Sequence, residues 1–506
     1  MIYDIIIVGC GPAGLAAALE LKRLRPELRI AAFEKSSVVG GHLVSGAILQ
    51  KDEYIKYAAK YKLESATEIV GESSWYLTKA SHLDFSPLVP SALRNIGNTL
   101  IDVSEMCRKM ARRAEHLGVH IFTSCGVFDI VTHANSVIGV VLASGRKILS
   151  KHTFLAEGAG GTVTTKLLAF HGRSANASYA LGVREERELA SNRNVGAVFH
   201  TLGWPLSSYE NWGGGFVYFY NRVVAIGYIT YLSYKNSYVC PYSNFERFSN
   251  HPSVRKIIGE TERTKYGAKL IALNSVGNER GACYPGCTII GCAFGVMDVL
   301  KLKGLNMALE SGERAAEIYI SSTCKSVSNT MPSWLTASDL KALTAARATN
   351  LVLRKYGIVA SALYKTAVSV AAVFGLNLSI SVKTEHNVYS SALAAAVTQP
   401  LRSWNCEDSK GEALAASGLK YLRNTNHISV NDQLTHKLYD LRVFDKLTTR
   451  LCPAGVYSWH KKLKHYTFGI QRENCLQCKT CCVKTAGKTI NWRPDAAGGG
   501  PNYVTR

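Results

Sequence analysis

Four cysteines near the C-terminus have the type and number needed to hold an iron–sulfur cluster. Cys475, Cys478 and Cys481 recur at every third position in the stretch ENCLQCKTCCVK. A C-x-x-C-x-x-C loop can present three thiolates to one centre, and a fourth thiolate completes a [4Fe–4S] site. The Cys-Pro pair that often accompanies such a loop lies upstream here, at Cys452 in LCPAGVYSW. We therefore predict one 4Fe–4S cluster bound by these four residues.

Two other interpretations of these cysteines are open at this point. Structural zinc also uses C-x-x-C spacing, but a zinc site usually pairs two such knuckles, whereas here one triplet meets one distant cysteine. The cysteines could also be ordinary buried residues. Cys482 is expected to be a bystander, although it could replace Cys481 if the loop shifts. Cys283, Cys287 and Cys292 are more typical of small buried hydrophobes than of ligands.

The N-terminal residues carry the pattern of a dinucleotide-binding βαβ unit. The run YDIIIVG predicts a buried strand, GCGPAG supplies Gly9, Gly11 and Gly14, and LAAALELKRL has helical periodicity. A second strand, RIAAF, ends at Glu34. Gly9 allows a tight turn, Gly11 lets a pyrophosphate approach the backbone, and Gly14 lets helix and strand pack closely. Because a helix N-terminus attracts phosphate and Glu34 can accept ribose hydroxyls, we predict dinucleotide binding rather than an ordinary glycine-rich turn.

The dinucleotide is expected to be FAD. After the acidic residue, EKSSVVGGHLVSGAIL resembles the segment that passes over the flavin in glutathione-reductase-type enzymes. The stretch LAEGAGG, with Glu157, Gly158, Gly160 and Gly161, looks like the strand end that closes the FAD site. Enzymes of this type that oxidise a nicotinamide usually carry a second G-x-G-x-x-G, and this sequence has none. A bound nicotinamide is therefore not predicted.

Composition limits the classes of protein to which the chain can belong. Its 506 residues are 47% hydrophobic, enough to bury large cores in about two to four domains. The formal net charge of +22 favours an acidic partner, although a generally basic proteome would give the same balance. Lys and Arg are scattered, so no nucleic-acid partner is predicted. The 14 cysteines do not form a secreted disulfide framework, and neither a signal peptide nor a transit segment is recognised, so a reducing compartment is expected.

Flavin at one end and a cluster at the other describe an electron-transfer enzyme, and further motifs resemble one family. The C-terminal stretches resemble those of electron-transfer-flavoprotein:ubiquinone oxidoreductases: CPAGVYSW, NCLQCKTC, INW and GGGPNY. Other stretches resemble further blocks of that family and occur in the same order: GGHLVSGA, GWPL with WGGGFVY, HPSVRKIIG…YGAKLI and YPGCTIIGCAFGVMDVLKLKG. The resemblance covers almost the whole chain and is weakest between about Ser322 and Arg450.

The resemblance implies which residues bind each cofactor and the quinone. The adenosine half of FAD would lie on Gly9, Gly11, Gly14 and Glu34. The segment that approaches the pyrophosphate and the isoalloxazine edge would include Gly291, Gly295 and Gly304. The quinone head-group would meet the backbone of Gly213 and Gly214, where the residues alone suggest only a tight turn. The cluster would be held by Cys452, Cys475, Cys478 and Cys481.

The implied architecture is α/β. A glutathione-reductase-like FAD-binding fold would carry an inserted mixed-sheet quinone domain and a C-terminal ferredoxin-like iron–sulfur domain. The FAD domain is predicted at 1–165 and 276–325, and the quinone domain at 166–275. A helical membrane-surface and connecting region would follow at 326–435, and the 4Fe–4S domain at 436–506.

The family implies an electron-transferring-flavoprotein dehydrogenase. It would take electrons from reduced electron-transfer flavoprotein and pass them through FAD and the cluster to ubiquinone. No catalytic acid, base or nucleophile is expected, because the cofactors perform the redox chemistry. One alternative is a related flavin dehydrogenase of the geranylgeranyl-reductase or nitrogen-fixation type. The other is a non-catalytic subunit of a respiratory complex that keeps the fold.

Because ubiquinone is held in lipid, we expect the protein to enter one leaflet of a membrane without spanning it. The best apolar stretch, TAVSVAAVFGLNLSISV between Lys365 and Lys383, is short of the ~20 apolar residues of a span and could also be a buried core helix. A weaker patch is LVPSALRNIG, Leu88 to Gly97, and Lys355, Lys365 and Lys383 could meet anionic lipid. The membrane would be the mitochondrial inner membrane, on its matrix face, in a eukaryote, and the cytoplasmic face of the plasma membrane in a bacterium.

The chain departs from the family beside the flavin and the quinone. Leu300 stands where the family usually has Pro. The family's Thr-His-Thr is replaced by Leu305, Asn306 and Met307. Trp212 replaces a Tyr before the glycine pair. These changes bear on the flavin potential and on quinone affinity rather than on whether the cofactors are present.

Overall fold

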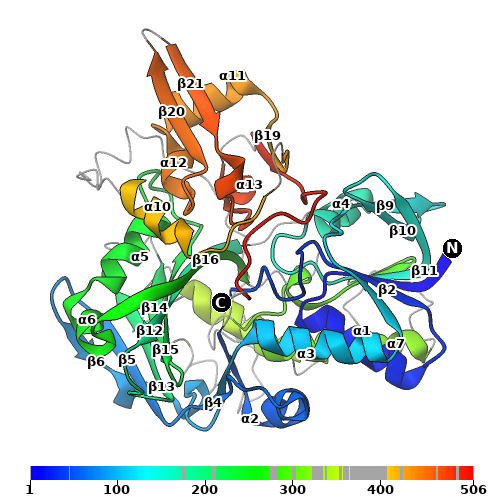
Figure 1. Ribbon diagram of the computed structural model, residues 1–506, viewed down its shortest axis with the longest axis horizontal. Helices are drawn as coiled ribbons and strands as arrows, with labels where there is room; N and C mark the ends of the chain where they lie inside the picture. Colours follow the sequence, from blue (N-terminus) through cyan, green and yellow to red (C-terminus); the bar gives the residue numbers. More distant parts are fainter. Residues whose placement is uncertain are drawn as a thin grey trace.

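The computed structural model describes three units that lie side by side (Figure 1). An N-terminal α/β unit is mostly blue and cyan, a second sheet is mostly green, and a C-terminal unit is orange and red. The residues described are 2–44, 46–173, 178–206, 212–273, 282–298, 304–321, 334–336, 339–352, 356, 364, 407–421, 425–462, 465–485 and 489–504. The apolar stretch 366–382, its flanking lysines, Lys355 and Leu300 lie outside these residues.

The first sheet is parallel at its centre, as expected for strands that are apolar on both faces. β1 (Ile2–Val8) lies between β2 (Ile30–Phe33) and β11 (Lys147–Leu155), which both run parallel to it. β8 (Val119–Phe122) and β18 (Cys287–Ile289) continue the sheet in parallel on either side. The carboxyl ends of these strands therefore meet at one edge, where an open α/β sheet binds its ligands.

Helices cover this sheet and hold its loops. The long ones are α1 (Pro12–Leu24), α3 (Val103–His116) and α7 (Leu305–Ile320). Helices α1 and α7 pack so closely that a Cβ at Gly312 would lie 2.2 Å from the Ala13 carbonyl oxygen. The other α-helices and strands of this unit are β3 (Ala47–Leu49), α2 (Lys51–Glu53), β4 (Thr67–Glu68), β7 (Thr99–Ile101), β9 (Val127–His133), β10 (Ser136–Leu142), α4 (Thr162–Phe170) and β17 (Cys283–Tyr284). Strands β3, β7 and β4 form a small sheet of their own.

The second sheet has seven strands and is antiparallel except between β13 and β5. Its strands in spatial order are β16 (Thr261–Leu273), β12 (Ser178–Leu189), β15 (Val223–Tyr231), β14 (Gly213–Phe219), β13 (Ala197–Gly203), β5 (Gly71–Leu77) and β6 (His82–Asp84). Strands β5 and β6 come from residues inside the first predicted FAD segment. Helices α5 (Pro241–Ser249) and α6 (Pro252–Ile258) pack beside this sheet.

An ion network is buried in the second sheet. The Glu185 carboxylate on β12 is fully buried and accepts hydrogen bonds from Arg187 Nε and Arg263 Nε, each at 2.5 Å. Arg263 also lies 3.3 Å from Glu246. Removing one partner of a buried pair leaves uncompensated charge, which costs more than the pair itself contributes.

Glu185→Gln is therefore expected to lower the free energy of unfolding by about 3–5 kcal/mol. Urea denaturation followed by circular dichroism measures the change. Glu188→Gln is the matched control, because Glu188 lies on the same strand with an exposed side chain. Equal stabilities of the two variants would contradict the assigned role of Glu185.

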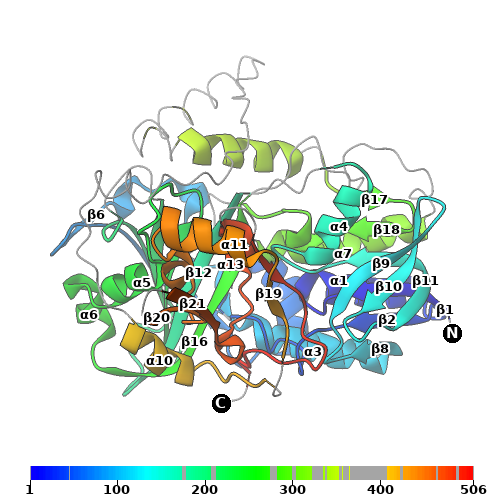
Figure 2. The same ribbon diagram turned by 90° about the horizontal axis from the view of Figure 1, so that it is seen from above.

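The C-terminal unit packs against the second sheet and shares a hydrophobic core with it. It contains α10 (Glu407–Ala415), β19 (Ile428–Val430), α11 (Gln433–His436), α12 (Leu447–Leu451), β20 (Tyr457–Lys462), β21 (His465–Ile470), α13 (Thr480–Lys484) and β22 (Ile490–Trp492). Tyr266 of β16 donates to the Pro453 carbonyl at 2.8 Å. The last residues return between the other two units, where Tyr503 N donates to the Gly41 carbonyl at 3.0 Å (Figures 1 and 2).

Candidate functional site

The three glycines of the N-terminal turn have the geometry that a dinucleotide cradle needs. Gly9 has a φ of +102°, and a Cβ there would lie 2.6 Å from the Ala156 carbonyl oxygen. A Cβ on Gly14 would lie 2.1 Å from the Gly9 carbonyl oxygen. At Gly11, by contrast, no protein atom lies within 4 Å of the Cβ position. Two glycines are thus required by the chain itself, and the third opens onto space that a pyrophosphate can fill.

Glu34 lies directly after β2 and faces the same turn. Its Oε2 accepts a hydrogen bond from Cys10 N at 3.0 Å, and its Oε1 accepts one from Ser36 N at 2.9 Å. The carboxylate is therefore fixed beside the glycines, although it lies twenty residues after Gly14 in the sequence. This is the position from which an acid can accept ribose hydroxyls.

The other predicted FAD residues lie near the same edge of the sheet. Gly158 follows β11, has a φ of +74° and has open space at its Cβ position. Gly291 follows β18, and its N–H donates to Ser311 Oγ of α7 at 2.9 Å. Gly295 has a φ of +100°, and Gly304 is the N-cap of α7. The predicted FAD residues therefore lie near one another in the structure, although the first and last of them, Gly9 and Gly304, are 295 positions apart in the sequence.

Two helix N-termini at this edge have no side-chain cap. Gly11 precedes α1 and Gly304 precedes α7, and neither helix has an acidic residue in its first turn. Uncapped N–H groups and the positive end of the helix dipole attract phosphate and other anionic groups. Asn306, in the first turn of α7, donates to Gln50 Oε1 at 2.5 Å, while its own Oδ1 is buried without a hydrogen bond. The residues present therefore fit FAD.

The four predicted cluster ligands line one buried pocket. Cys452 follows α12, Cys475 and Cys478 lie in the loop before α13, and Cys481 lies in α13. The loop turns back on itself because Gln477 and Lys479 both have left-handed backbone conformations. Burial raises the pKa of the Cys452 thiol and raises that of Cys478 to about 12. Binding iron as thiolates would therefore release protons.

The lining of this pocket favours a cluster over zinc. It contains four thiols and no His, Asp or Glu side chain. A tetrahedral zinc ion with Zn–S bonds of about 2.3 Å draws its four sulfurs together around one point. The four cysteines surround one shared space, which suits a cluster in which each thiolate binds a different iron. Cys482 does not line the pocket, although its side chain is hydrogen-bonded to Cys481, and its bystander role stays a prediction.

Two buried hydroxyls lie beside the cysteine sulfurs. The Tyr457 hydroxyl faces Cys481 and the Thr480 hydroxyl faces Cys478. Within the described part of the chain, neither hydroxyl has a hydrogen-bond partner of ordinary geometry. Both are available to donate to the sulfur atoms of a bound cluster.

Tyr457→Phe is expected to lower the reduction potential of the cluster, because hydrogen bonds to the sulfurs favour the more negative, reduced form. A decrease of about 60 mV would correspond to a tenfold shift of a one-electron equilibrium. Redox titration followed by EPR measures it. Tyr466→Phe is the control, because Tyr466 lies on the same hairpin outside the pocket lining. Equal potentials of the two variants would exclude a hydrogen bond from Tyr457.

The predicted quinone glycines begin β14. A Cβ on Gly213 would lie 1.9 Å from the Ile229 carbonyl oxygen, and one on Gly214 would lie 2.3 Å from the Thr201 carbonyl oxygen. Neighbouring strands therefore exclude a side chain at either position. Trp212, just before them, is half-buried. Contact of this backbone with quinone stays a prediction.

Three lysines that the sequence analysis did not single out lie where the two sites meet, and we call Lys35, Lys269 and Lys479 the junction lysines. Lys35 Nζ donates to Gln477 Oε1 at 2.9 Å, which joins the end of β2 to the cysteine loop. Lys479 Nζ donates to the Gly160 carbonyl at 3.0 Å, which joins the cysteine loop to the loop after β11. The FAD site and the cysteine pocket are therefore in direct contact.

Lys269 reaches the same region from the second sheet. Its Nζ donates to the His42 carbonyl at 3.3 Å. The Nζ atoms of Lys35 and Lys479 lie 4.9 and 4.6 Å from the Trp492 ring centroid. Burial and neighbouring lysine charges lower the pKa of both Lys35 and Lys269. Only position in the sequence could have pointed to these lysines. Lys35 directly follows Glu34, and Lys479 lies between Cys478 and Cys481.

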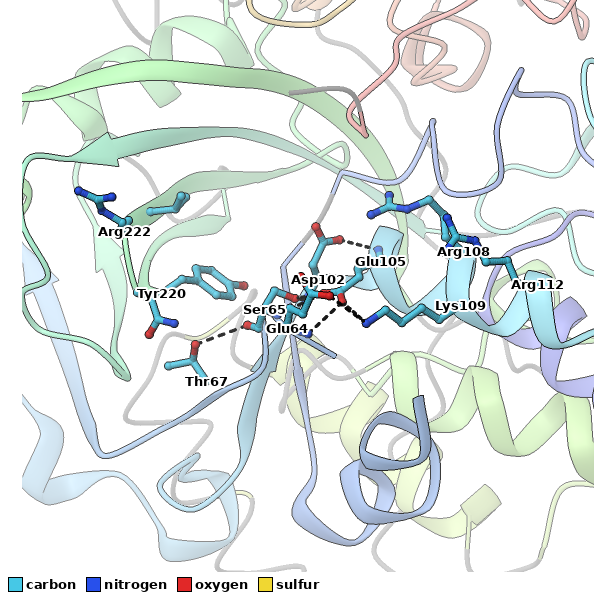
Figure 3. Close-up of a pocket in the computed structure, with 12 residues that line it drawn as sticks. Glu64, Ser65, Thr67, Asp102, Glu105, Arg108, Lys109, Arg112, Tyr220 and Arg222 are labelled. Carbon is cyan, nitrogen blue, oxygen red and sulfur yellow. Dashed lines mark hydrogen bonds and ion pairs between the residues drawn. The ribbon is translucent and has the colours of Figure 1, made fainter. Parts of the chain in front are cut away.

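A separate cleft of about 530 Å³ lies between α3 and the turn after β14 (Figure 3). Ser65 and Lys109 both bond to Glu105, and Lys109 also pairs with Glu64. Burial alone would raise the pKa of Glu105, but hydrogen bonds from Ser65 and Lys109 outweigh that effect and lower it to about 2. The cleft contains none of the predicted FAD, cluster or quinone residues.

Three protein-family models match successive parts of the chain. The model for pyridine nucleotide-disulphide oxidoreductases matches residues 3–196. The model for the ubiquinone-binding domain of ETF-QO matches residues 179–271. The 4Fe-4S model of electron transfer flavoprotein-ubiquinone oxidoreductase matches residues 413–504. Fold and sites therefore define a flavin-dependent oxidoreductase with an iron–sulfur domain.

Curated relatives identify the family. The mitochondrial electron transfer flavoprotein-ubiquinone oxidoreductase of Oryza sativa is 30% identical over 100% of this chain and 93% of its own length. The protein of the same name from Pseudomonas aeruginosa is 29% identical over 99% and 98%. This chain belongs to the electron transfer flavoprotein-ubiquinone oxidoreductase family. Its cofactors are FAD and one 4Fe–4S cluster, as predicted.

Solved structures confirm the α/β fold. A geranylgeranyl bacteriochlorophyll reductase-like protein from Thermoplasma acidophilum matches with a TM-score of 0.54 at 15% identity, over 78% of this chain and 96% of that one. The flavin-dependent brominase Bmp2 matches with a TM-score of 0.50 at 14% identity, over 74% and 93%. At this identity the likeness concerns the fold alone.

Proposed function

We propose that this chain oxidises reduced electron transfer flavoprotein and passes the electrons through FAD and the 4Fe–4S cluster to ubiquinone. The observation that carries the proposal is the contact between two cofactor sites within one chain. Lys479, which lies between Cys478 and the start of α13, is hydrogen-bonded to the carbonyl of Gly160 in the loop after β11 at the FAD site. Such contact suits electron transfer between the sites, because no intervening domain separates them.

The bound cofactors supply the redox chemistry, and the residues of the chain position and insulate them. Gly11, Gly158 and the uncapped N-termini of α1 and α7 would hold FAD. The cluster would be held by Cys452, Cys475, Cys478 and Cys481. Each ubiquinone accepts two electrons and two protons, and the protons can come from solvent at the head-group.

The quinone site is proposed at the start of β14. Gly213 and Gly214 lie within residues 179–271, which the ubiquinone-binding model matches, and neither carries a side chain that would keep a quinone carbonyl from the main chain. Trp212 beside them would contribute an aromatic wall in place of the family's usual Tyr. Replacing Trp212 with Tyr should change the KM for a ubiquinone analogue more than it changes kcat, whereas a purely structural residue would change stability alone.

The proposal is tested with purified protein in detergent. Reduced electron transfer flavoprotein is mixed with the protein and a short-chain ubiquinone analogue, and ubiquinol formation is followed. Sustained turnover supports the proposal and excludes a non-catalytic subunit. Reduction of FAD and cluster without turnover, or turnover with another electron donor alone, would overturn it in favour of one of the alternative dehydrogenases.

We further propose that the protein binds one leaflet of a membrane. No described helix is long and apolar enough to cross a bilayer. The predicted patch Leu88 to Gly97 is described, and Leu88 and Ile96 are 82% and 58% exposed. Leu83, on the adjoining edge strand β6, is 64% exposed. Apolar side chains gathered at a sheet edge mark an interaction surface.

Flotation with anionic vesicles tests membrane binding. Leu88→Asp is expected to reduce the bound fraction severalfold, because it places a charge in the apolar patch. Leu434→Asp is the matched control, since Leu434 is 81% exposed on the C-terminal unit. Equal flotation of both variants would contradict this surface. The membrane proposed is the mitochondrial inner membrane, on its matrix face, in a eukaryote, or the cytoplasmic face of the plasma membrane in a bacterium.

A further inference from the structure

The junction lysines bring three buried amino groups together, and no carboxylate of the described residues is paired with any of them. Their hydrogen-bond partners are an amide oxygen and two carbonyl oxygens, all of them neutral. In the part of the chain that the structure describes, none of them forms an ion pair, while Glu34 and Glu157 act on Lys35 and Lys479 only at longer range. Gathering ammonium groups in a largely buried place is unfavourable unless an anion lies beside them.

The two cofactors are the anions that this position offers. FAD carries a diphosphate, and a 4Fe–4S cluster with four thiolates has a net negative charge. Glu34 at the FAD site and Cys478 at the pocket both lie close enough to Lys269 to affect its pKa. Lys35 likewise lies between Glu34 and Cys475. The lysines therefore stand between the sites rather than within one of them.

We propose that Lys35, Lys269 and Lys479 form a positively charged bridge between the FAD and cluster sites that raises the reduction potential of the cluster. The inference rests on the proposed function, because it concerns the electron path of that same pair of sites. Adding an electron to a cluster beside positive charge is favoured, and a site shielded from water strengthens the effect. The bridge also draws its members from all three units, so their relative placement sets the strength of this effect.

The origin of the lysines makes separate tests possible. Lys479 lies inside the cysteine loop, so its replacement could disturb cluster assembly. Lys269 lies on β16 and Lys35 follows β2, and both are outside that loop. A change of the cluster reduction potential on replacing Lys269 therefore reports the loss of its charge rather than damage to the cysteine loop.

The experiment is a redox titration of purified holoprotein, followed by EPR for the cluster and by visible absorbance for FAD. Lys269→Met and Lys479→Met are each expected to lower the cluster potential by about 59 mV, a tenfold shift of a one-electron equilibrium. Lys269→Arg and Lys479→Arg keep the charge and should stay close to the parent. Lys461→Met is the control, because Lys461 is exposed on the C-terminal unit.

An unchanged cluster potential in Lys269→Met and in Lys35→Met would overturn the bridge, whatever happens to Lys479→Met. An equal fall in the Met and Arg variants would also overturn it, since that result reports packing instead of charge. Failure of the proposed function looks different, because the parent protein would then hold a titratable cluster and FAD without reducing ubiquinone. The two ideas are thus judged by separate measurements.

Discussion

Replacing Cys478 with alanine is expected to abolish the EPR signal of the reduced 4Fe–4S cluster and to lower ubiquinone reduction by more than about 100-fold. Loss of a group outside the ligand set already weakens metal binding by about 10–100-fold, so loss of a ligand should exceed that. FAD should stay bound, because Cys478 lies in the pocket lining and none of the FAD residues does.

The neighbouring cysteines provide a matched control. Cys482 has the same chemistry four residues further along the chain but does not line the pocket. Cys482→Ala should therefore keep the cluster signal, the visible spectrum and activity close to the parent. Iron and acid-labile sulfide are measured with FAD content in all three proteins, so that loss of the cluster is separated from loss of the fold.

Other outcomes would change the assignment. Stoichiometric zinc without iron in protein purified anaerobically would make the cysteine pocket a structural site and remove it from the electron path. If Cys482→Ala lost the cluster signal and Cys481→Ala kept it, Cys482 would replace Cys481 as a cluster ligand. Either result would contradict the ligand set that lines the pocket.

The FAD unit could be predicted from sequence because its signals are local. Gly9, Gly11 and Gly14 lie where a strand passes into a helix, both with clear periodicity, and Glu34 directly follows the next strand, twenty residues after Gly14. Gly9 and Gly14 answer close contacts of the backbone, and Gly11 leaves open the space that a pyrophosphate needs. Spacing alone likewise located the cysteines, since three of them lie within seven residues.

What could not be predicted depends on contacts between distant segments. Lys35, Lys269 and Lys479 meet only after three units have packed, and a single lysine in a sequence carries no signal of that meeting. The same is true of β5 and β6, which join the second sheet although they are encoded among residues of the first unit. Strand pairing is set by the partner strand, which periodicity along one segment does not reveal.

Gly14→Val is expected to lose stability, whereas Gly11→Val is expected to lose FAD binding. A side chain at Gly14 meets the Gly9 carbonyl oxygen at 2.1 Å, so Gly14→Val should destabilise the apoprotein by about 3 kcal/mol or more. A side chain at Gly11 meets no protein atom within 4 Å. Gly11→Val should therefore fold normally and fill the space that the pyrophosphate needs.

The expected loss for Gly11→Val is a roughly 100-fold weaker affinity for FAD, or about 2.7 kcal/mol, comparable to one charged hydrogen bond. Apoprotein stability is measured by urea denaturation, and FAD affinity by quenching of flavin fluorescence on reconstitution. Unchanged affinity in Gly11→Val would place the pyrophosphate elsewhere. Equal destabilisation of both apoproteins would mean that the space at Gly11 is closed by protein in solution. Because Gly11→Val is expected to leave the apoprotein intact, weaker FAD binding in that variant reports a ligand in the space at Gly11.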